Sequence, residues 1–86
     1  MRSFSLIVST PEGNVYEGTV EKLSLRGAEG DLAILQGHVP FVTVVKEGSV
    51  QITEEGGNIL DAKCSKGILT VSSNETVLLT SSFEKV

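Results

Sequence analysis

The sequence has few of the residues on which chemistry at a protein site depends. Its 86 residues include one histidine, one cysteine and no tryptophan. A metal site needs three or four converging ligands, and the scattered carboxylates of this chain show no such spacing. A hydroxyl or thiol nucleophile needs a base, and His38 in a Gly-His-Val-Pro turn is more typical of a loop. Because the glycine-rich phosphate-binding motifs are also missing, the sequence predicts no catalytic residue, no metal and no cofactor.

Basic residues are also scarce. Seven Lys and Arg stand against eleven Asp and Glu, which gives a formal net charge of −4 and a pI near 4.8. Nucleic acids and anionic lipids are bound by clustered basic side chains, so neither is an expected partner. The single cysteine, Cys64, excludes an intramolecular disulfide. It alternates with Leu60 and Ala62, which indicates a small, buried and inert side chain.

No hydrophobic run is long enough to cross a membrane as a helix. The longest uncharged stretch covers residues 32–45 and is interrupted by Gly37 and Pro40, whereas a spanning helix needs about 20 apolar residues. The first residues contain too short an apolar segment for a signal peptide, so a reducing, intracellular compartment is expected. Any association with a membrane should therefore be peripheral.

The hydrophobic residues follow the period of β-strands. Val, Ile and Thr are frequent, and no stretch repeats apolar residues at helical spacing over three turns. We therefore predict an all-β domain covering residues 1–86, without a substantial helix. The alternating sets are Phe4, Leu6 and Val8; Val50 and Ile52; Leu60, Ala62 and Cys64; and Val77 and Leu79.

Turn signals divide the chain into short segments, as expected for a sandwich or a barrel. Glycines in residues 55–58 predict a tight hairpin. A break in the alternation predicts a bulge near residues 20–22. Residues 82–86 carry no pattern and are expected to be loose. The predicted strands are 3–9, 14–17, 19–26, 31–35, 41–46, 49–54, 58–64, 67–71 and 76–81.

Two loops offer surfaces that could recognise a partner. Glu29 and Asp31 flank Gly30 on a tight turn, and their carboxylates repel each other unless a cation or a donor faces them. A second turn, residues 38–41, presents an apolar rim of the kind that often marks partner contacts. From the residues alone, a solvated acidic turn is favoured over a binding site.

Several short motifs in fixed order connect the chain with a known family. The motifs are Val20-Glu21-Lys22, Gly27-x-Glu29-Gly30-Asp31-Leu32, Gly37-His38-x-Pro40 with Thr43, and Gly67-Ile68-Leu69 with a following valine. With these motifs in this order and at these separations, the sequence resembles the N-terminal β-sandwich domain of the epsilon subunits of F-type ATP synthases, over essentially its whole length.

The resemblance implies a flattened sandwich of two sheets with about ten short strands. It also implies a non-catalytic subunit of the rotor, or central stalk, that clamps the gamma subunit to the ring of c subunits and couples ion translocation to ATP synthesis. Glu29, Gly30 and Asp31 map onto the contact with the c ring. His38, Pro40 and Thr43 map onto the contact with gamma. The implied location is the cytoplasmic face of a bacterial inner membrane, with a chloroplast thylakoid as the less favoured address.

The chain departs from the family in length and at a few positions. Gln36 stands where proline is frequent before Gly-His, and Asp31 where glutamate is frequent. Family members usually continue into a pair of helices that bind ATP or inhibit hydrolysis, so a naturally short form is expected to bind no ATP. The alternative from another class is a free-standing β-sandwich module that binds peptide or carbohydrate, although such carbohydrate modules usually present aromatic platforms.

Overall fold

All regular structure in the described part of the chain is β-strand. The computed structural model describes residues 3–37, 39–73 and 75–86. This confirms the predicted all-β class, and no helix in these residues is long and apolar enough to span a bilayer. The nine strands are β1 (Phe4–Thr10), β2 (Gly13–Gly27), β3 (Gly30–Leu35), β4 (Phe41–Val45), β5 (Gly48–Glu54), β6 (Ile59–Cys64), β7 (Gly67–Val71), β8 (Glu75–Thr80) and β9 (Phe83–Lys85).

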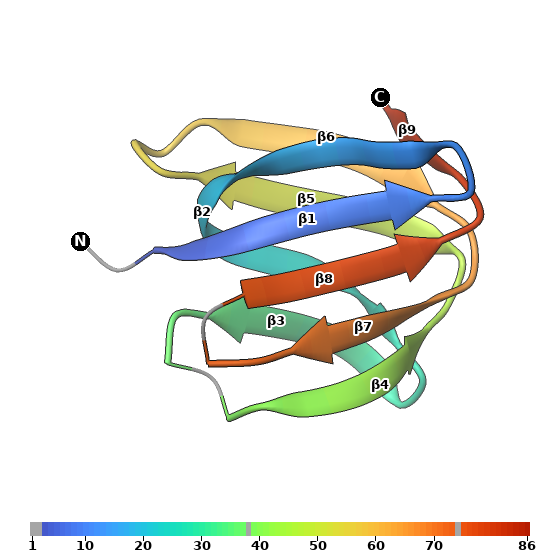
Figure 1. Cartoon of the computed structure of the whole chain (residues 1–86), viewed down its shortest axis with the longest axis horizontal. Coiled ribbons are helices and arrows are strands. Elements are labelled where there is room, and N and C mark those ends of the chain that lie inside the picture. The colour runs from blue at the N-terminus through green and yellow to red at the C-terminus, as the bar shows by residue number, and fades with distance from the viewer. Residues whose placement is uncertain (1–2, 38, 74) are drawn as a thin grey trace.

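The strands form a sandwich whose two layers share β2. One layer contains β1, β8, β7 and β4, which follow one another from top to bottom in Figure 1. The other contains β3, β5, β6 and β9 beside the second half of β2. The first half of β2 pairs instead with β1. The sandwich is therefore one continuous hydrogen-bonded path, in which nine strands are described where the resemblance implied about ten.

A bulge allows β2 to serve both layers. Val20 lies opposite Glu54 and Lys22 lies opposite Thr53, so one residue of β2 is extra at this point. Such a residue bends the strand and increases its twist. The predicted bulge near residues 20–22 is confirmed. The predicted division into strands 14–17 and 19–26 is wrong, because Gly18 stays in the strand, where a Cβ would lie 3.0 Å from the Tyr16 hydroxyl oxygen.

One cluster of buried side chains fills the space between the layers. The inward-facing residues that the sequence predicts are correct for β1, β5 and β6. They are wrong for β8, where Val77 is half-buried and Leu79 is 49% exposed, whereas Thr76, Leu78 and Thr80 are buried. The buried hydrophobic residues are Leu6, Val8, Val20, Leu23, Leu25, Ile34, Val45, Val50, Ile52, Ala62, Cys64, Leu69, Val71 and Leu78.

The inward face of β8 was predicted wrongly because two of its buried residues are threonines. The Thr80 hydroxyl lies 2.9 Å from the Ser65 carbonyl oxygen and 3.1 Å from that of Ser82, so its polar group is satisfied inside the protein. A hydrogen-bonded threonine can occupy a core position at little cost. The sequence Thr-Val-Leu-Leu-Thr therefore has apolar residues on both sides of the strand.

The hairpin prediction is confirmed and the prediction for the tail is not. Gly56 and Gly57 have φ angles of 99° and 95°, and they connect β5 to β6 as expected of a tight turn. Residues 82–86 are not loose, because β9 pairs with β6 and the Val86 amide donates to the Asp61 carbonyl oxygen at 2.9 Å. Phe83 packs against the core and anchors the tail. Its strand has only three residues, which is too short for an alternating pattern to be recognised in the sequence.

Candidate docking surfaces

The acidic turn predicted from the sequence is a two-residue β-hairpin. Gly27 and Gly30 form the last pair of β2 and β3, so Ala28 and Glu29 stand at the tip. Gly30 has a φ angle of 128°, and a Cβ there would meet no atom within 4 Å. The glycine is therefore needed for its backbone conformation and not for space. Glu29, Gly30 and Asp31 are all exposed, as a contact surface requires.

A cation faces one of the two carboxylates of this turn. Arg26 on β2 lies directly opposite Asp31 on β3. Oppositely charged residues in facing positions of two strands attract each other. Glu29 stands at the tip, beyond the last pair of the hairpin, so no residue of β2 lies opposite it, and its side chain is exposed like that of Asp31. The two glycines define the register of the hairpin. From that register, the sequence could have identified Arg26 as the residue opposite Asp31.

The second predicted contact set is only partly brought together. His38 lies outside the described residues. Pro40 is exposed immediately before β4, while Thr43 is half-buried in the middle of that strand, opposite the buried Leu69. Thr43 therefore shares the inward side of β4 with the core. The outward side belongs to Val42 and Val44, which are 67% and 56% exposed.

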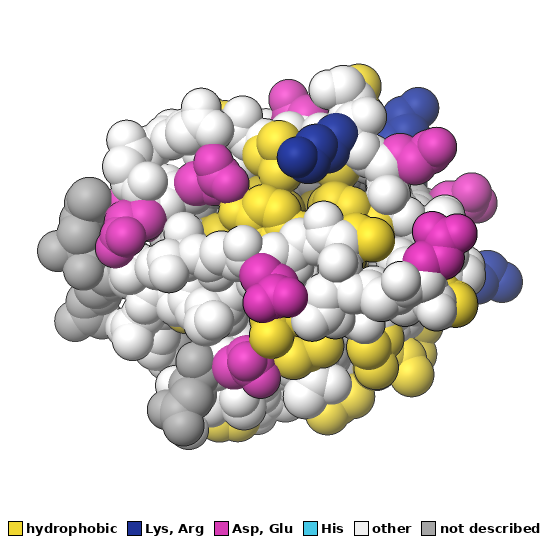
Figure 2. Space-filling model, turned by 45° about the horizontal axis from the view of Figure 1, so that its top comes forward, with side chains coloured by type: hydrophobic (Ala, Val, Ile, Leu, Met, Phe, Trp, Pro, Cys, Tyr) yellow, Lys and Arg dark blue, Asp and Glu magenta, His cyan; other side chains and the backbone are white. Residues whose placement is uncertain are grey.

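These valines belong to a continuous outer surface, here called the apolar face. Val44, Ile68 and Leu79 are facing residues on β4, β7 and β8, and Val42, Thr70 and Val77 form the neighbouring row. None of these six side chains is charged. Ile68 and Leu79 are 46% and 49% exposed. Figure 2 shows hydrophobic side chains gathered at the lower right, on the side where β7 and β4 lie in Figure 1. Contiguous apolar surface of this kind marks a docking site more often than isolated exposed residues do.

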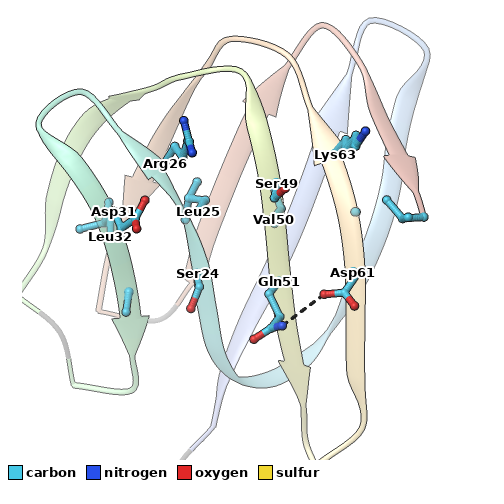
Figure 3. A pocket seen from close by; sticks show the side chains of 13 residues that line it. Ser24, Leu25, Arg26, Asp31, Leu32, Ser49, Val50, Gln51, Asp61 and Lys63 are labelled. Atoms are coloured by element: carbon cyan, nitrogen blue, oxygen red, sulfur yellow. Dashed lines mark hydrogen bonds between the residues drawn. The ribbon is translucent and has the colours of Figure 1, made fainter.

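The opposite outer surface, here called the polar face, has a different composition. Ser24, Gln51 and Asp61 are facing residues on β2, β5 and β6, and Ser49 faces Lys63 in the next row. The Gln51 amide donates to Asp61 Oδ1 at 3.2 Å, as Figure 3 shows. A shallow hollow of about 710 Å³ runs along this face, with Arg26 and Asp31 at one side. Charged side chains of both signs lie on this face, as is typical of a surface in contact with water.

Tyr16, Glu54 and Asn58 tie β2 to the hairpin between β5 and β6. The Tyr16 hydroxyl donates to Glu54 Oε2 at 2.6 Å, and the Asn58 amide donates to Oε1 at 2.8 Å. These hydrogen bonds, that of Tyr16 first, hold the pKa of the Glu54 carboxyl below its usual value. Burial, followed by the bond to Glu54, raises the pKa of Tyr16. Both oxygens of the Glu54 carboxylate are therefore engaged in bonds that link β2 to the hairpin between β5 and β6.

The described residues contain no arrangement suited to chemistry. No group of three His, Cys, Asp or Glu in this part of the chain could hold a metal ion. The Cys64 thiol is buried, and burial raises its pKa, which keeps it in the unreactive protonated form. The exposed hairpin and the apolar face are what remains, and both are suited to recognition by another protein.

Curated relatives share this sequence over nearly its whole length. It is 36% identical to the ATP synthase epsilon chain of Bacillus velezensis over 84 residues, and these cover 98% of this chain. Identity to the epsilon chain of Bacillus thuringiensis is 34% over 85 residues, or 99% of this chain. The chain spans 63% of the length of each of these relatives.

The fold is also found in solved structures of mitochondrial ATP synthases. A chain of the Euglena gracilis OSCP/F1/c-ring structure superimposes with a TM-score of 0.90 at 20% identity, over 96% of this chain and 53% of that one. A chain of the Tetrahymena thermophila central stalk and c-ring structure gives a TM-score of 0.76 at 17% identity, over 93% of this chain and 64% of that one.

The family described as "ATP synthase, Delta/Epsilon chain, beta-sandwich domain" matches residues 3–86. This match covers all of the described strands and agrees with the resemblance that the sequence motifs indicated. The chain belongs to the family of ATP synthase delta/epsilon chain β-sandwich domains.

Proposed function

We propose that this chain is a non-catalytic rotor subunit of an F-type ATP synthase. In this role it joins the gamma subunit to the c ring and couples ion translocation to ATP synthesis. The family match over residues 3–86 is the observation that carries the proposal. The proposed location is the cytoplasmic face of a bacterial inner membrane, which the chain reaches through the complex.

The acidic hairpin is the proposed contact with the c ring. Glu29, Gly30 and Asp31 are exposed on a turn that β2 and β3 hold in a defined conformation. Basic and amide groups on loops of the ring would complement the carboxylates. Because Arg26 faces Asp31, Glu29 should contribute the larger part of this attraction. Such rim charges set orientation and association rate more than affinity.

The side of the molecule that carries β4 is the proposed contact with gamma. His38, Pro40 and Thr43 are the positions that the family resemblance assigns to this contact. The apolar face supports the assignment, because it begins on β4 with Val42 and Val44 and extends over β7 and β8. Burying apolar area of this kind stabilises a complex by roughly 25 cal/mol per Å² before the costs of association.

Close packing suits the domain to transmit torque. The buried side chains form one cluster between the two layers, and none of the buried side-chain polar atoms in the described residues lacks a hydrogen-bond partner. Packed protein interiors are hardly compressible. A load applied at the acidic hairpin would therefore reach the β4 side of the sandwich with little deformation.

The alternative, a free-standing module for peptide or carbohydrate, has less support. Modules that bind sugars present exposed aromatic rings. Here Phe4, Tyr16, Phe41 and Phe83 are all partly buried and packed against the core. The rotor subunit is therefore the better explanation of the same sandwich.

Reconstitution tests the proposal directly. The chain would be titrated into bacterial ATP synthase particles that have been stripped of epsilon, with retention on gamma and on the c ring measured separately from ion-driven ATP synthesis. We expect stoichiometric retention and restored coupling. Retention on neither gamma nor the ring would contradict the proposal and favour the free-standing module.

A further inference from the structure

Strand β4 has an open edge. Along all five of its residues it pairs with β7, but it meets β2 at its end, where Val45 lies opposite Gly27 and the Lys46 amide donates to the Arg26 carbonyl oxygen at 2.9 Å. Beyond that pair β2 continues with β3 and β5 in the other layer. Among the described strands, residues 42–44 therefore pair on one side only. Backbone groups on the other side of such a strand are available to a further strand.

This edge lacks the protection that the other margins of the sandwich possess. Natural proteins guard exposed edges with charged residues or very short strands. β9 has three residues, two of which are Glu84 and Lys85. β3 carries Asp31, and the first half of β2 carries Glu17 beside Gly18. β4 reads Phe-Val-Thr-Val-Val and has no charge. Its composition is that of a strand inside a sheet.

The apolar face continues up to this edge. Val42 and Val44 point outward and are more than half exposed, and Val44 begins the row that Ile68 and Leu79 complete. A strand added beside β4 would lie about 4.8 Å away. Its outward side chains would extend the two rows and cover the valines. Backbone pairing and apolar contact thus favour the same position.

A second copy of the chain does not fit this edge well. Two copies would each bring a net charge of −4. The largest apolar patch of an ordinary monomer is on the order of 300–600 Å², whereas a stable interface buries about 800 Å² on each partner. The occupant must therefore contact further surface around β4, which a larger partner of different sequence can do.

We propose that a partner subunit adds an extended, uncharged segment rich in β-branched and apolar residues to the open edge of β4. This inference rests on the proposed rotor function, in which gamma lies on this side of the molecule. It specifies how the contact is made: the partner segment extends the β1, β8, β7 and β4 layer by one strand. Alternate side chains of the segment pack beside Val42 and Val44.

Amide hydrogen exchange on the unmodified chain tests the inference. The labelled chain would be measured free and after assembly with gamma in the stripped particles. Strand addition bonds every second amide of β4, so we expect exchange to slow by about tenfold or more at alternate residues. Unchanged exchange along β4 in a complex that has formed would overturn the strand addition and leave the rotor function intact. Failure of the unmodified chain to bind gamma would contradict both.

Charged substitutions provide the second measurement. Val44→Lys places an edge-guarding charge on β4, and we expect binding to gamma to weaken about tenfold or more. Ile59→Lys is the matched control, because Ile59 is also 56% exposed on a strand but lies on β6 in the other layer. Both variants should keep the circular dichroism of the unmodified chain. Equal binding by the two variants would overturn the inference.

Discussion

The two outer faces of the sandwich are built from the same kind of strand but differ in what they present. On the polar face, the outward residues of β5 and β6 include Gln51, Asp61 and Lys63, together with one exposed apolar residue, Ile59. On the apolar face, β4, β7 and β8 carry apolar residues on both sides. Alternation is typical of a sheet with one face in water, and apolar residues on both sides are typical of a covered sheet. This difference is the reason for proposing that the apolar face is the one that meets a partner.

The largest expected effect separates inward from outward residues on the apolar layer. Leu78 is fully buried and its neighbour Leu79 is half exposed. Leu78→Ala should lower the free energy of unfolding by about 2–5 kcal/mol, because it leaves a cavity in the core. Leu79→Ala should lower it by less than about 1 kcal/mol. Urea denaturation followed by circular dichroism measures both, and similar values would mean that the two sides of β8 have been confused.

The next prediction concerns binding and compares the faces directly. A double variant, Ile68→Ser with Leu79→Ser, removes the centre of the apolar face and should weaken retention on gamma by about tenfold or more. Gln51→Ala with Lys63→Ala changes the polar face to a similar extent and should leave retention unchanged. Both sets would be measured on stripped particles. A stronger loss from the polar face would reverse the assignment of the surfaces.

A smaller effect is expected at the acidic hairpin. Glu29→Lys and Asp31→Lys should both weaken docking on the c ring, by a few-fold and more strongly at low salt, because exposed charges are screened. Only Asp31→Lys places a like charge opposite Arg26, which should cost the fold about 0.2–1 kcal/mol. Glu29→Lys should leave the stability unchanged. Retention on the ring at two salt concentrations, with thermal unfolding of the free chain, separates the two contributions.

Sequence patterns predicted what depends on local periodicity. The inward residues of β1, β5 and β6, the glycine hairpin and the bulge in β2 were all recoverable, since each follows from alternation or from backbone conformation. The inward face of β8 was not, because Thr76 and Thr80 are buried while Val77 and Leu79 point outward. β9 was missed because it depends on pairing with β6, a contact between distant segments.

The same limit applies to the docking surfaces. The exposed carboxylates of the β2–β3 turn could be predicted from the glycines beside them. Arg26 required the register of that hairpin, and the apolar face required the order of β4, β7 and β8 in their layer. Side chains from three strands form that face, so no stretch of the sequence contains it. Surfaces of this kind emerge only when the topology is known.

The smallest expected effect tests the link that holds the first half of β2 to the hairpin between β5 and β6. Hydrogen bonds from Tyr16 and Asn58 lower the pKa of Glu54 in the folded state. The ionised carboxylate therefore stabilises the fold above the unfolded pKa of about 4.3, and this contribution is lost as the pH falls through the lower, folded pKa. Tyr16→Phe removes the largest cause and should make stability less sensitive to acid in this range. Urea midpoints from pH 6 to pH 3 would measure this. An unchanged acid dependence in Tyr16→Phe would mean that Asn58 and the charge of Lys85 maintain the pKa of Glu54 without Tyr16.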